Sequence, residues 1–180
     1  MIRLFVGLSL PLDVRQRLAA MSGGVPGARW EPEENFHLTL RFIGEVEHGQ
    51  ADDIHAELSR LRVPRFEMSL SAIDHFGSGD KARVLYVGVD RNELLLRLQA
   101  KVENAVQRAG AQPEQRKFRP HVTLARLRDA PEHRLAAFRE AYNLFRAGPI
   151  AVEEFALFSS HPGKGNAVYH EEATYPLDGA

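Results

Sequence analysis

Hydrophobic positions along the chain alternate between a two-residue period, typical of strands, and a period of three to four residues, typical of helices. Residues 36–43 follow the strand period. The apolar side chains predicted to share one face of this strand are Phe36, Leu38, Leu40 and Phe42. Residues 91–109 follow the helical period, and Gly110 stands where a helix C-cap belongs. Both kinds of element are therefore expected in one chain.

The same criteria predict the remaining elements. Further strands are expected over residues 2–8, 65–74, 82–90, 119–126, 150–158 and 166–174. Further helices are expected over residues 11–21 and 49–61, and after Pro131. Turn-rich residues 77–80 join two of these strands, which predicts a hairpin, and residues 161–165 separate the last strand pair. This order of elements indicates an α+β (α/β-like) protein with residues 1–180 in a single domain.

Composition narrows the functional classes. The 180 residues carry 23 Lys and Arg against 24 Asp and Glu, a net charge of -1, which disfavours a protein that coats nucleic acid by bulk charge. There is no Cys, which excludes disulfides, thiol nucleophiles and Cys-based metal sites. No apolar run approaches the length of a membrane span, and the N-terminal run lacks a cleavage site. We expect a cytoplasmic protein that does not bind membranes.

One short pattern occurs twice. Residues 36–40 read Phe-His-Leu-Thr-Leu and residues 120–124 read Pro-His-Val-Thr-Leu, both inside predicted strands. With 8 His and Thr at only positions 39, 123 and 174, chance predicts roughly 0.13 His-x-Thr pairs in this chain. Because side chains two apart share a strand face, His37 lies beside Thr39 and His121 beside Thr123. If the two strands meet, they frame a site with two imidazoles and two hydroxyls.

These groups suit proton transfer at a phosphate. One neutral imidazole can take a proton from water while an imidazolium gives a proton to the leaving oxygen. The Thr hydroxyls can donate to non-bridging phosphoryl oxygens. Neither His has the neighbouring carboxylate or second His expected of a metal site, so we predict no metal and no cofactor.

Two longer segments carry a family resemblance. They read Asn-Phe-His-Leu-Thr-Leu-Arg-Phe-Ile-Gly-Glu (35–45) and Arg-Pro-His-Val-Thr-Leu-Ala-Arg (119–126). They resemble the paired signatures of the two-histidine (2H) phosphoesterases, and more narrowly the RNA 2′,3′-cyclic phosphodiesterases, also called 2′-5′ RNA ligase-like proteins. Residues 3–8, Trp30, residues 83–86 and residues 152–158 agree with the same family. One departure is Ser159-Ser160, where members often carry Glu-Ser.

The resemblance implies two pseudo-symmetric lobes, each an antiparallel-rich sheet with helices on its outer face, around a central cleft that bears both His-x-Thr motifs. It also implies metal-independent hydrolysis of an RNA-terminal or nucleoside 2′,3′-cyclic phosphate to a 2′-phosphomonoester, with the reverse 2′-5′ ligation open. His37 matches the proton donor and His121 the proton acceptor. Thr39 and Thr123 match the phosphate-binding hydroxyls. The implied partner is an RNA 3′ end or a small cyclic nucleotide, and we expect a monomer.

Two arginines following the motifs are further candidates for substrate binding. In an unbroken strand Arg41 shares the face of His37 and Thr39, whereas Arg126 falls on the opposite face. Arg126 nevertheless matches the family signature more closely, and a bulge or strand end after Thr123 would reconcile the two observations. Either residue is alternatively a solvated surface charge.

Residues 116–119 (Arg-Lys-Phe-Arg) could guide an RNA backbone into the cleft, and Phe76 and Phe5 are further candidates for base stacking. An ordinary charged loop is the alternative for residues 116–119. Two other functions stay open: a non-catalytic RNA-end or nucleotide-binding module that uses the same cleft, and a His-based metal hydrolase, which the sequence favours least.

Overall fold

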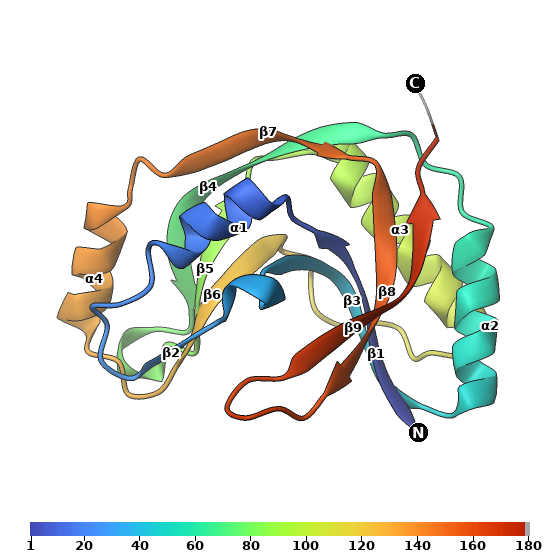
Figure 1. Cartoon of the computed structure of the whole chain (residues 1–180), viewed down its shortest axis with the longest axis horizontal. Coiled ribbons are helices and arrows are strands. Elements are labelled where there is room, and N and C mark those ends of the chain that lie inside the picture. The colour runs from blue at the N-terminus through green and yellow to red at the C-terminus, as the bar shows by residue number, and fades with distance from the viewer. Residues whose placement is uncertain (179–180) are drawn as a thin grey trace.

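The computed structural model describes residues 1–178, which form nine strands and four α-helices (Figure 1). The strands are β1 (Ile2–Ser9), β2 (Ala28–Trp30), β3 (His37–Val46), β4 (Phe66–Phe76), β5 (Val84–Val89), β6 (His121–Leu127), β7 (Arg146–Val152), β8 (Glu154–His161) and β9 (Val168–Pro176). The helices are α1 (Leu12–Ala19), α2 (His48–Ser59), α3 (Glu93–Arg108) and α4 (Glu132–Ala141). The protein is therefore of the predicted α+β class.

The strands form one antiparallel sheet in the order β7-β4-β5-β6-β3-β1-β8-β9, with β2 paired to β6. A single pairing, Leu38 with Val122, joins β3 to β6 at the centre and divides the sheet into a half of four strands that contains β3 and a half that contains β6, with four strands and the short β2. The halves correspond in sequence. Strands β3 and β6 begin at residues 37 and 121, and the helices that follow them begin at residues 48 and 132, which is the same separation. Two pseudo-symmetric halves therefore meet at the pair of motif strands.

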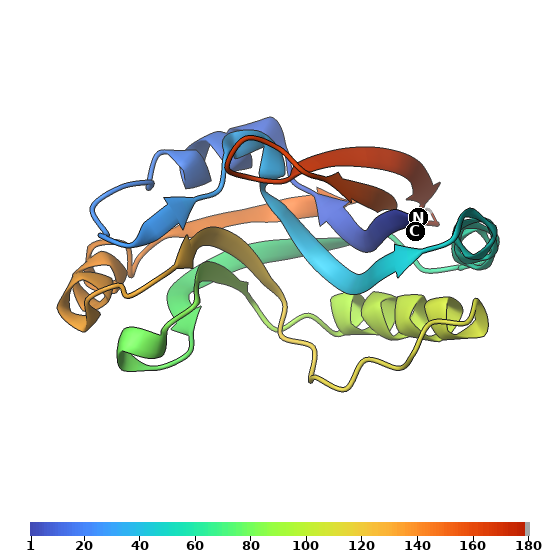
Figure 2. The same ribbon diagram turned by 90° about the horizontal axis from the view of Figure 1, so that it is seen from below.

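The hydrophobic core lies against one face of these central strands. Leu38, Leu40, Val122 and Leu124, the residues that alternate with His and Thr in the motifs, are at most 3% exposed. Helices stand at both ends of the sheet: α2 and α3 lie side by side at one end, and α1 and α4 lie toward the other (Figures 1 and 2). Burial of the aliphatic residues thereby fixes which strand face carries the polar motif residues.

Helix α3 shows how the sequence sets one of these elements. The Asn92 side chain caps its N-terminus by accepting the Leu95 N–H at 3.0 Å. Leu95, Leu98 and Val102 are buried on its inner face. Gly110, just beyond the helix, adopts a φ of +98°, which few other residues tolerate. The predicted helix over residues 91–109 is confirmed.

The prediction for residues 150–158 is wrong. These residues belong to two strands, since β7 ends at Val152, β8 begins at Glu154, and the two lie in opposite halves of the sheet. The alternation of apolar residues continues across the break, which hides it in the sequence. Figure 1 shows the chain passing from β7 directly into β8. The predicted β4–β5 hairpin and the final hairpin, now β8–β9, are confirmed.

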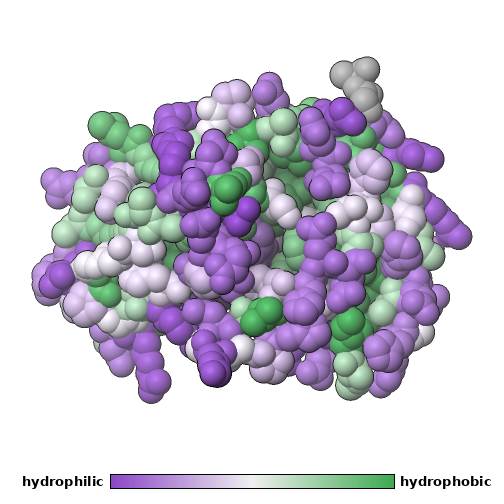
Figure 3. Space-filling view, in the orientation of Figure 1, coloured by the Kyte–Doolittle hydropathy of each residue, from purple (hydrophilic) through white to green (hydrophobic). Residues whose placement is uncertain are grey.

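The surface is mostly polar on the face drawn in Figure 3, where hydrophobic residues are scattered between hydrophilic ones. Within residues 1–178, none of the helices is both long enough and apolar enough to cross a bilayer.

Candidate active site

All four motif side chains line one cleft. Its volume is about 890 Å³, and His37 and Thr39 of β3 and His121 and Thr123 of β6 are among the residues that enclose it. Because β3 and β6 run antiparallel through the Leu38–Val122 pair, the neighbouring register positions set His37 against Thr123 and Thr39 against His121. The sequence prediction that the two motifs converge is therefore borne out in the fold, whereas the roles of the four residues stay predictions.

The His37 ring is held on both of its nitrogens. Nδ1 is 2.7 Å from the Asn35 carbonyl oxygen and Nε2 is 2.8 Å from Thr39 Oγ1. A carbonyl can only accept, so Nδ1–H donates to it, and Nε2 of the neutral ring accepts the Thr39 hydroxyl. Burial lowers the pKa of His37 to about 4, opposed by the Asn35 carbonyl and reinforced by the charges of His121 and Arg126. His37 is thus neutral in the unliganded cleft at pH 7.

The His121 ring is oriented in the same way. Its Nδ1–H donates to the Arg119 carbonyl oxygen at 2.7 Å, which leaves Nε2 for a ligand. Phe76 meets the ring edge-on at 4.9 Å between centroids, and Tyr86 lies at 5.4 Å. Burial lowers the pKa of His121 as well, against the Arg119 carbonyl and with the nearby charge of Arg126. Both rings therefore combine a fixed Nδ1–H with a basic Nε2.

A β-bulge follows Thr123 in β6. Consecutive residues Tyr86 and Leu85 of β5 pair with Thr123 and Ala125, so Leu124 is the extra residue. The bulge turns Arg126 to the cleft side, where it is exposed and lines the cleft. The bulge anticipated from the position of Arg126 is confirmed. Arg126 Nε lies 3.8 Å from Glu31 Oε1.

The corresponding bulge in β3 overturns two predictions. Consecutive residues Gly7 and Val6 of β1 pair with Thr39 and Arg41, so Leu40 is extra and the alternation shifts. Phe42, predicted to share the face of Leu38 and Leu40, is instead 52% exposed and lines the cleft. Arg41, predicted on the His37 face of an unbroken strand, is buried, and its guanidinium binds Glu103. Phe42 thus occupies the position in β3 that Arg126 occupies in β6, five residues after the motif histidine.

Positive side chains gather around the cleft although the net charge of the chain is -1. Those lining it, apart from Arg41, are Arg29, Arg83, Arg116, Lys117, Arg119 and Arg126. The aromatic candidates divide: Phe76 and Phe118 line the cleft, whereas Phe5 is 1% exposed and lies against the His37 ring at 4.8 Å. Phe5 therefore supports the histidine and is not available to stack on a base.

Three further cleft residues were missed from the sequence. Tyr169 of β9 meets the His37 ring edge-on at 5.2 Å, and no local motif marks it. Glu31 lies in the cleft, where burial raises its pKa although Arg126 and Asn35 act in the opposite direction. Phe42 could have been found only by aligning the two motifs beyond Thr.

These residues are suited to bind an anion and to transfer protons to and from it. Two imidazoles, two hydroxyls and several cationic side chains face one cavity. In the part of the chain that the structure describes, no group of three or more His, Asp or Glu side chains is arranged to hold a metal ion.

Comparisons with known proteins agree with this geometry. The sequence model of the LigT-like phosphoesterases matches the chain twice, over residues 8–86 and 87–169. The RNA 2′,3′-cyclic phosphodiesterase of Escherichia coli is 30% identical over 174 residues, which cover 93% of this chain and 92% of that protein. The protein of the same name from Aeropyrum pernix is 43% identical over 108 residues, which cover 59% of this chain and 61% of that protein.

The fold comparison covers nearly the whole chain. The structure of E. coli LigT with 3′-AMP superposes with a TM-score of 0.79 at 28% identity, over 98% of both chains. A Thermus thermophilus structure gives 0.80 at 27% identity, again over 98% of both. Each match of the family model contains one of the two His-x-Thr strands that line the cleft, so the repeated match reflects the repeated motif. The chain belongs to the LigT-like (2H) phosphoesterase family.

Proposed function

We propose that this protein hydrolyses the 2′,3′-cyclic phosphate of an RNA end, or of a small cyclic nucleotide, to a 2′-phosphomonoester and a free 3′-hydroxyl. One observation carries the proposal. Two His-x-Thr pairs line one cleft, and each imidazole is fixed by an Nδ1–H bond to a backbone carbonyl. Relatives covering most of the chain are named RNA 2′,3′-cyclic phosphodiesterases.

The reaction divides between the two rings. Water attacks phosphorus, His121 Nε2 accepts the water proton, and the P–O3′ bond breaks as His37 Nε2 donates a proton to O3′. Once His37 Nε2 carries a proton, it no longer accepts the Thr39 hydroxyl, so the Thr39 and Thr123 hydroxyls can both donate to the non-bridging oxygens, where negative charge develops in the transition state. Arg126 adds a positive charge on the same side. Arg41 is not included here, because its guanidinium is already bound to Glu103.

The protonation of His37 depends on the substrate. Its pKa of about 4 makes the imidazolium a minor form in the empty cleft at neutral pH. A phosphodiester anion in the cleft favours the charged form of a nearby imidazole. Binding of the anion therefore raises the pKa of His37 and favours the imidazolium, which takes its proton from solvent and then donates it to O3′.

The surroundings of the cleft favour a nucleotide polymer. Cations around the cleft match several phosphates, and the half-exposed Phe42 ring offers a face for a base. Both histidines come from one chain, which supports a monomer as the active unit. We place the activity in the cytoplasm, where RNA ends are processed.

Product analysis tests the proposal. Wild-type protein is incubated with a 2′,3′-cyclic nucleotide and with a short RNA ending in a cyclic phosphate, with and without EDTA. We expect the 2′-phosphate product, unaffected by EDTA, and a loss of at least about a hundredfold in kcat for His37→Ala and for His121→Ala. Full activity of either variant would refute the mechanism, and tight binding without product would favour the binding-module alternative.

A sulfur-substituted substrate tests the two roles separately. When O3′ is replaced by sulfur, the leaving thiolate needs no proton, because thiols have a pKa near 8.5. We expect this substrate to restore turnover of His37→Ala and not of His121→Ala. The reverse pattern would exchange the two roles.

A further inference from the structure

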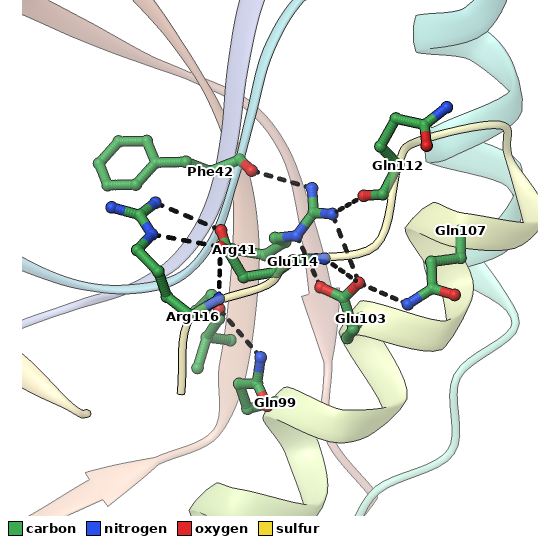
Figure 4. Close-up of polar contacts among 9 residues, drawn as sticks. Arg41, Phe42, Gln99, Glu103, Gln107, Gln112, Glu114 and Arg116 are labelled. Carbon is green, nitrogen blue, oxygen red and sulfur yellow. Dashed lines mark hydrogen bonds and ion pairs between the residues drawn. The ribbon is translucent and has the colours of Figure 1, made fainter. Parts of the chain in front are cut away.

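An ion pair between the buried Arg41 and the partly buried Glu103 joins strand β3 to helix α3 beside the cleft. Arg41 Nε lies 2.6 Å from Glu103 Oε1, and the side chains of the two residues are 5% and 16% exposed. Arg41 Nη1 donates to the Phe42 carbonyl oxygen at 2.9 Å, and Nη2 donates to Glu103 Oε2 and to the Gln112 carbonyl oxygen (Figure 4). The guanidinium donors are thus directed at protein oxygens, which leaves Arg41 outside the binding machinery of the cleft.

Glu103 extends these contacts into the chain beyond α3. Its Oε2 accepts the Gln107 side chain at 2.6 Å and the Glu114 backbone N–H at 3.2 Å. Burial alone would raise the pKa of Glu103, but the hydrogen bonds from Gln107, Arg41 and Glu114 outweigh it and lower the pKa. Glu103 is therefore held as a carboxylate that binds both Arg41 and the backbone of the following segment.

The segment that receives these bonds, residues 112–119, forms one wall of the cleft. Within the part of the chain that the structure describes, none of the backbone–backbone hydrogen bonds outside helices and strands involves residues 112–118. Glu114 instead accepts the backbone N–H of Arg116 at 3.0 Å and its guanidinium at 3.2 Å. Side-chain contacts, with Glu103 at their centre, therefore fix the course of this segment.

The same segment carries charges that face the cleft. Arg116, Lys117 and Arg119 line it, together with Phe118. Arg119 stands two residues before β6, and its carbonyl is bonded to His121, so this end of the segment is held by the strand and not by Glu103. A strand of RNA that enters the cleft with its 3′-terminal cyclic phosphate must leave along its 5′ side, and these cations can meet its phosphates.

We propose that Arg41 is a positioning residue which, through Glu103, holds segment 112–119 in place to bind the RNA phosphates on the 5′ side of the terminal cyclic phosphate. The proposal rests on the proposed function. A 2′,3′-cyclic mononucleotide has no such phosphates, so the loss of Arg41 affects the oligonucleotide selectively.

The variant for the test is the double substitution Arg41→Met with Glu103→Leu. Removing one partner alone leaves a buried charge unpaired, which strongly destabilises a protein, whereas replacing both by apolar residues is often tolerated. Kinetics are compared for cyclic 2′,3′-AMP and for a hexanucleotide RNA ending in a 2′,3′-cyclic phosphate. We expect the KM of the hexanucleotide to rise about tenfold, with its kcat and both constants of the mononucleotide within about twofold of wild type.

Arg108→Met is the matched control. Arg108 lies on the same helix as Glu103, and its Nε pairs with Glu57 of α2 at 2.8 Å. We expect this variant to leave the KM of both substrates unchanged. An unchanged hexanucleotide KM in the folded double variant, or an equal loss on both substrates, would overturn the proposal.

Hydrogen exchange provides a readout that does not need activity. In the double variant, amides of segment 112–119 should exchange faster, since the Glu114 N–H loses its acceptor, whereas exchange in β1 should stay as in wild type. Unchanged exchange in the segment would overturn the positioning role. If the wild type hydrolyses neither substrate, the proposed function fails on its own, and this exchange experiment with binding of a fluorescent RNA hexamer decides the role of Arg41.

Discussion

The perturbed pKa of His37 predicts that this ring makes folding stability depend on pH. The pKa is about 4 in the folded protein against the ordinary value of 6.5 for histidine, because burial disfavours the imidazolium. Between these values the unfolded chain binds a proton that the folded protein does not. The contribution of His37 is therefore fully present above pH 6.5 and is lost as the pH falls toward 4.

The magnitude follows from the size of the shift. Each unit corresponds to 1.36 kcal/mol, so the full effect below pH 4 is about 3 kcal/mol. Between pH 7 and pH 4.5 the linkage relation gives a loss of about 2 kcal/mol. That is a considerable part of the 5–15 kcal/mol by which a typical domain is stable.

Urea denaturation of the wild type and of His37→Gln measures this effect. Glutamine keeps a polar side chain that does not titrate, so groups elsewhere contribute to both proteins alike. We expect the difference in unfolding free energy between the two proteins to move by about 2 kcal/mol in favour of the variant between pH 7 and pH 4.5. A difference that stays constant over this range would refute the reasoning that burial keeps His37 neutral.

Three further predictions concern catalysis. Because the pKa of both histidines lies below 6.5, we expect kcat/KM for a cyclic phosphate to peak below pH 6.5, and a peak at pH 8 would contradict this. Phe42→Ala should raise the KM of a nucleotide substrate about tenfold with little change in Tm, since the ring is half exposed; an unchanged KM would exclude stacking on it. Gly7→Val should lower kcat at least about tenfold, because a Cβ at Gly7 would stand 2.7 Å from the Leu38 carbonyl oxygen and 3.6 Å from His37 Cδ2; a normal kcat would show that β3 yields without moving the ring.

Local alternation was enough to predict the faces of the two motifs. Leu38 and Val122 are buried, and the His and Thr side chains line the cleft, because a strand with one buried face has no other stable register. The convergence of two motifs so far apart in sequence is a consequence of the fold that the repeat itself suggested. The helices also begin and end near their predicted residues.

Alternation failed where the register depends on a partner strand. The bulges at Leu40 and Leu124 arise from pairing with β1 and β5, which the sequence around the motifs does not encode. The bulge in β6 could be anticipated because strand alternation put Arg126 on the face opposite His121, whereas the family signature favoured Arg126 as a substrate-binding residue. For Arg41, alternation indicated the cleft face and nothing in the sequence contradicted it. The role of segment 112–119 was equally hidden, since it depends on Glu103 from a preceding helix.

The pseudo-symmetry of the cleft breaks at the residue opposite each Thr. Gly7 pairs with Thr39, whereas Tyr86 pairs with Thr123. The missing side chain at Gly7 leaves room for the Leu38 carbonyl and the His37 ring, which then lies against Phe5 and loses solvent. At the equivalent place the Tyr86 ring stands beside His121 instead. The two His-x-Thr motifs thus meet different surroundings, and since surroundings set imidazole basicity, the duplicated sequence yields two histidines with different environments.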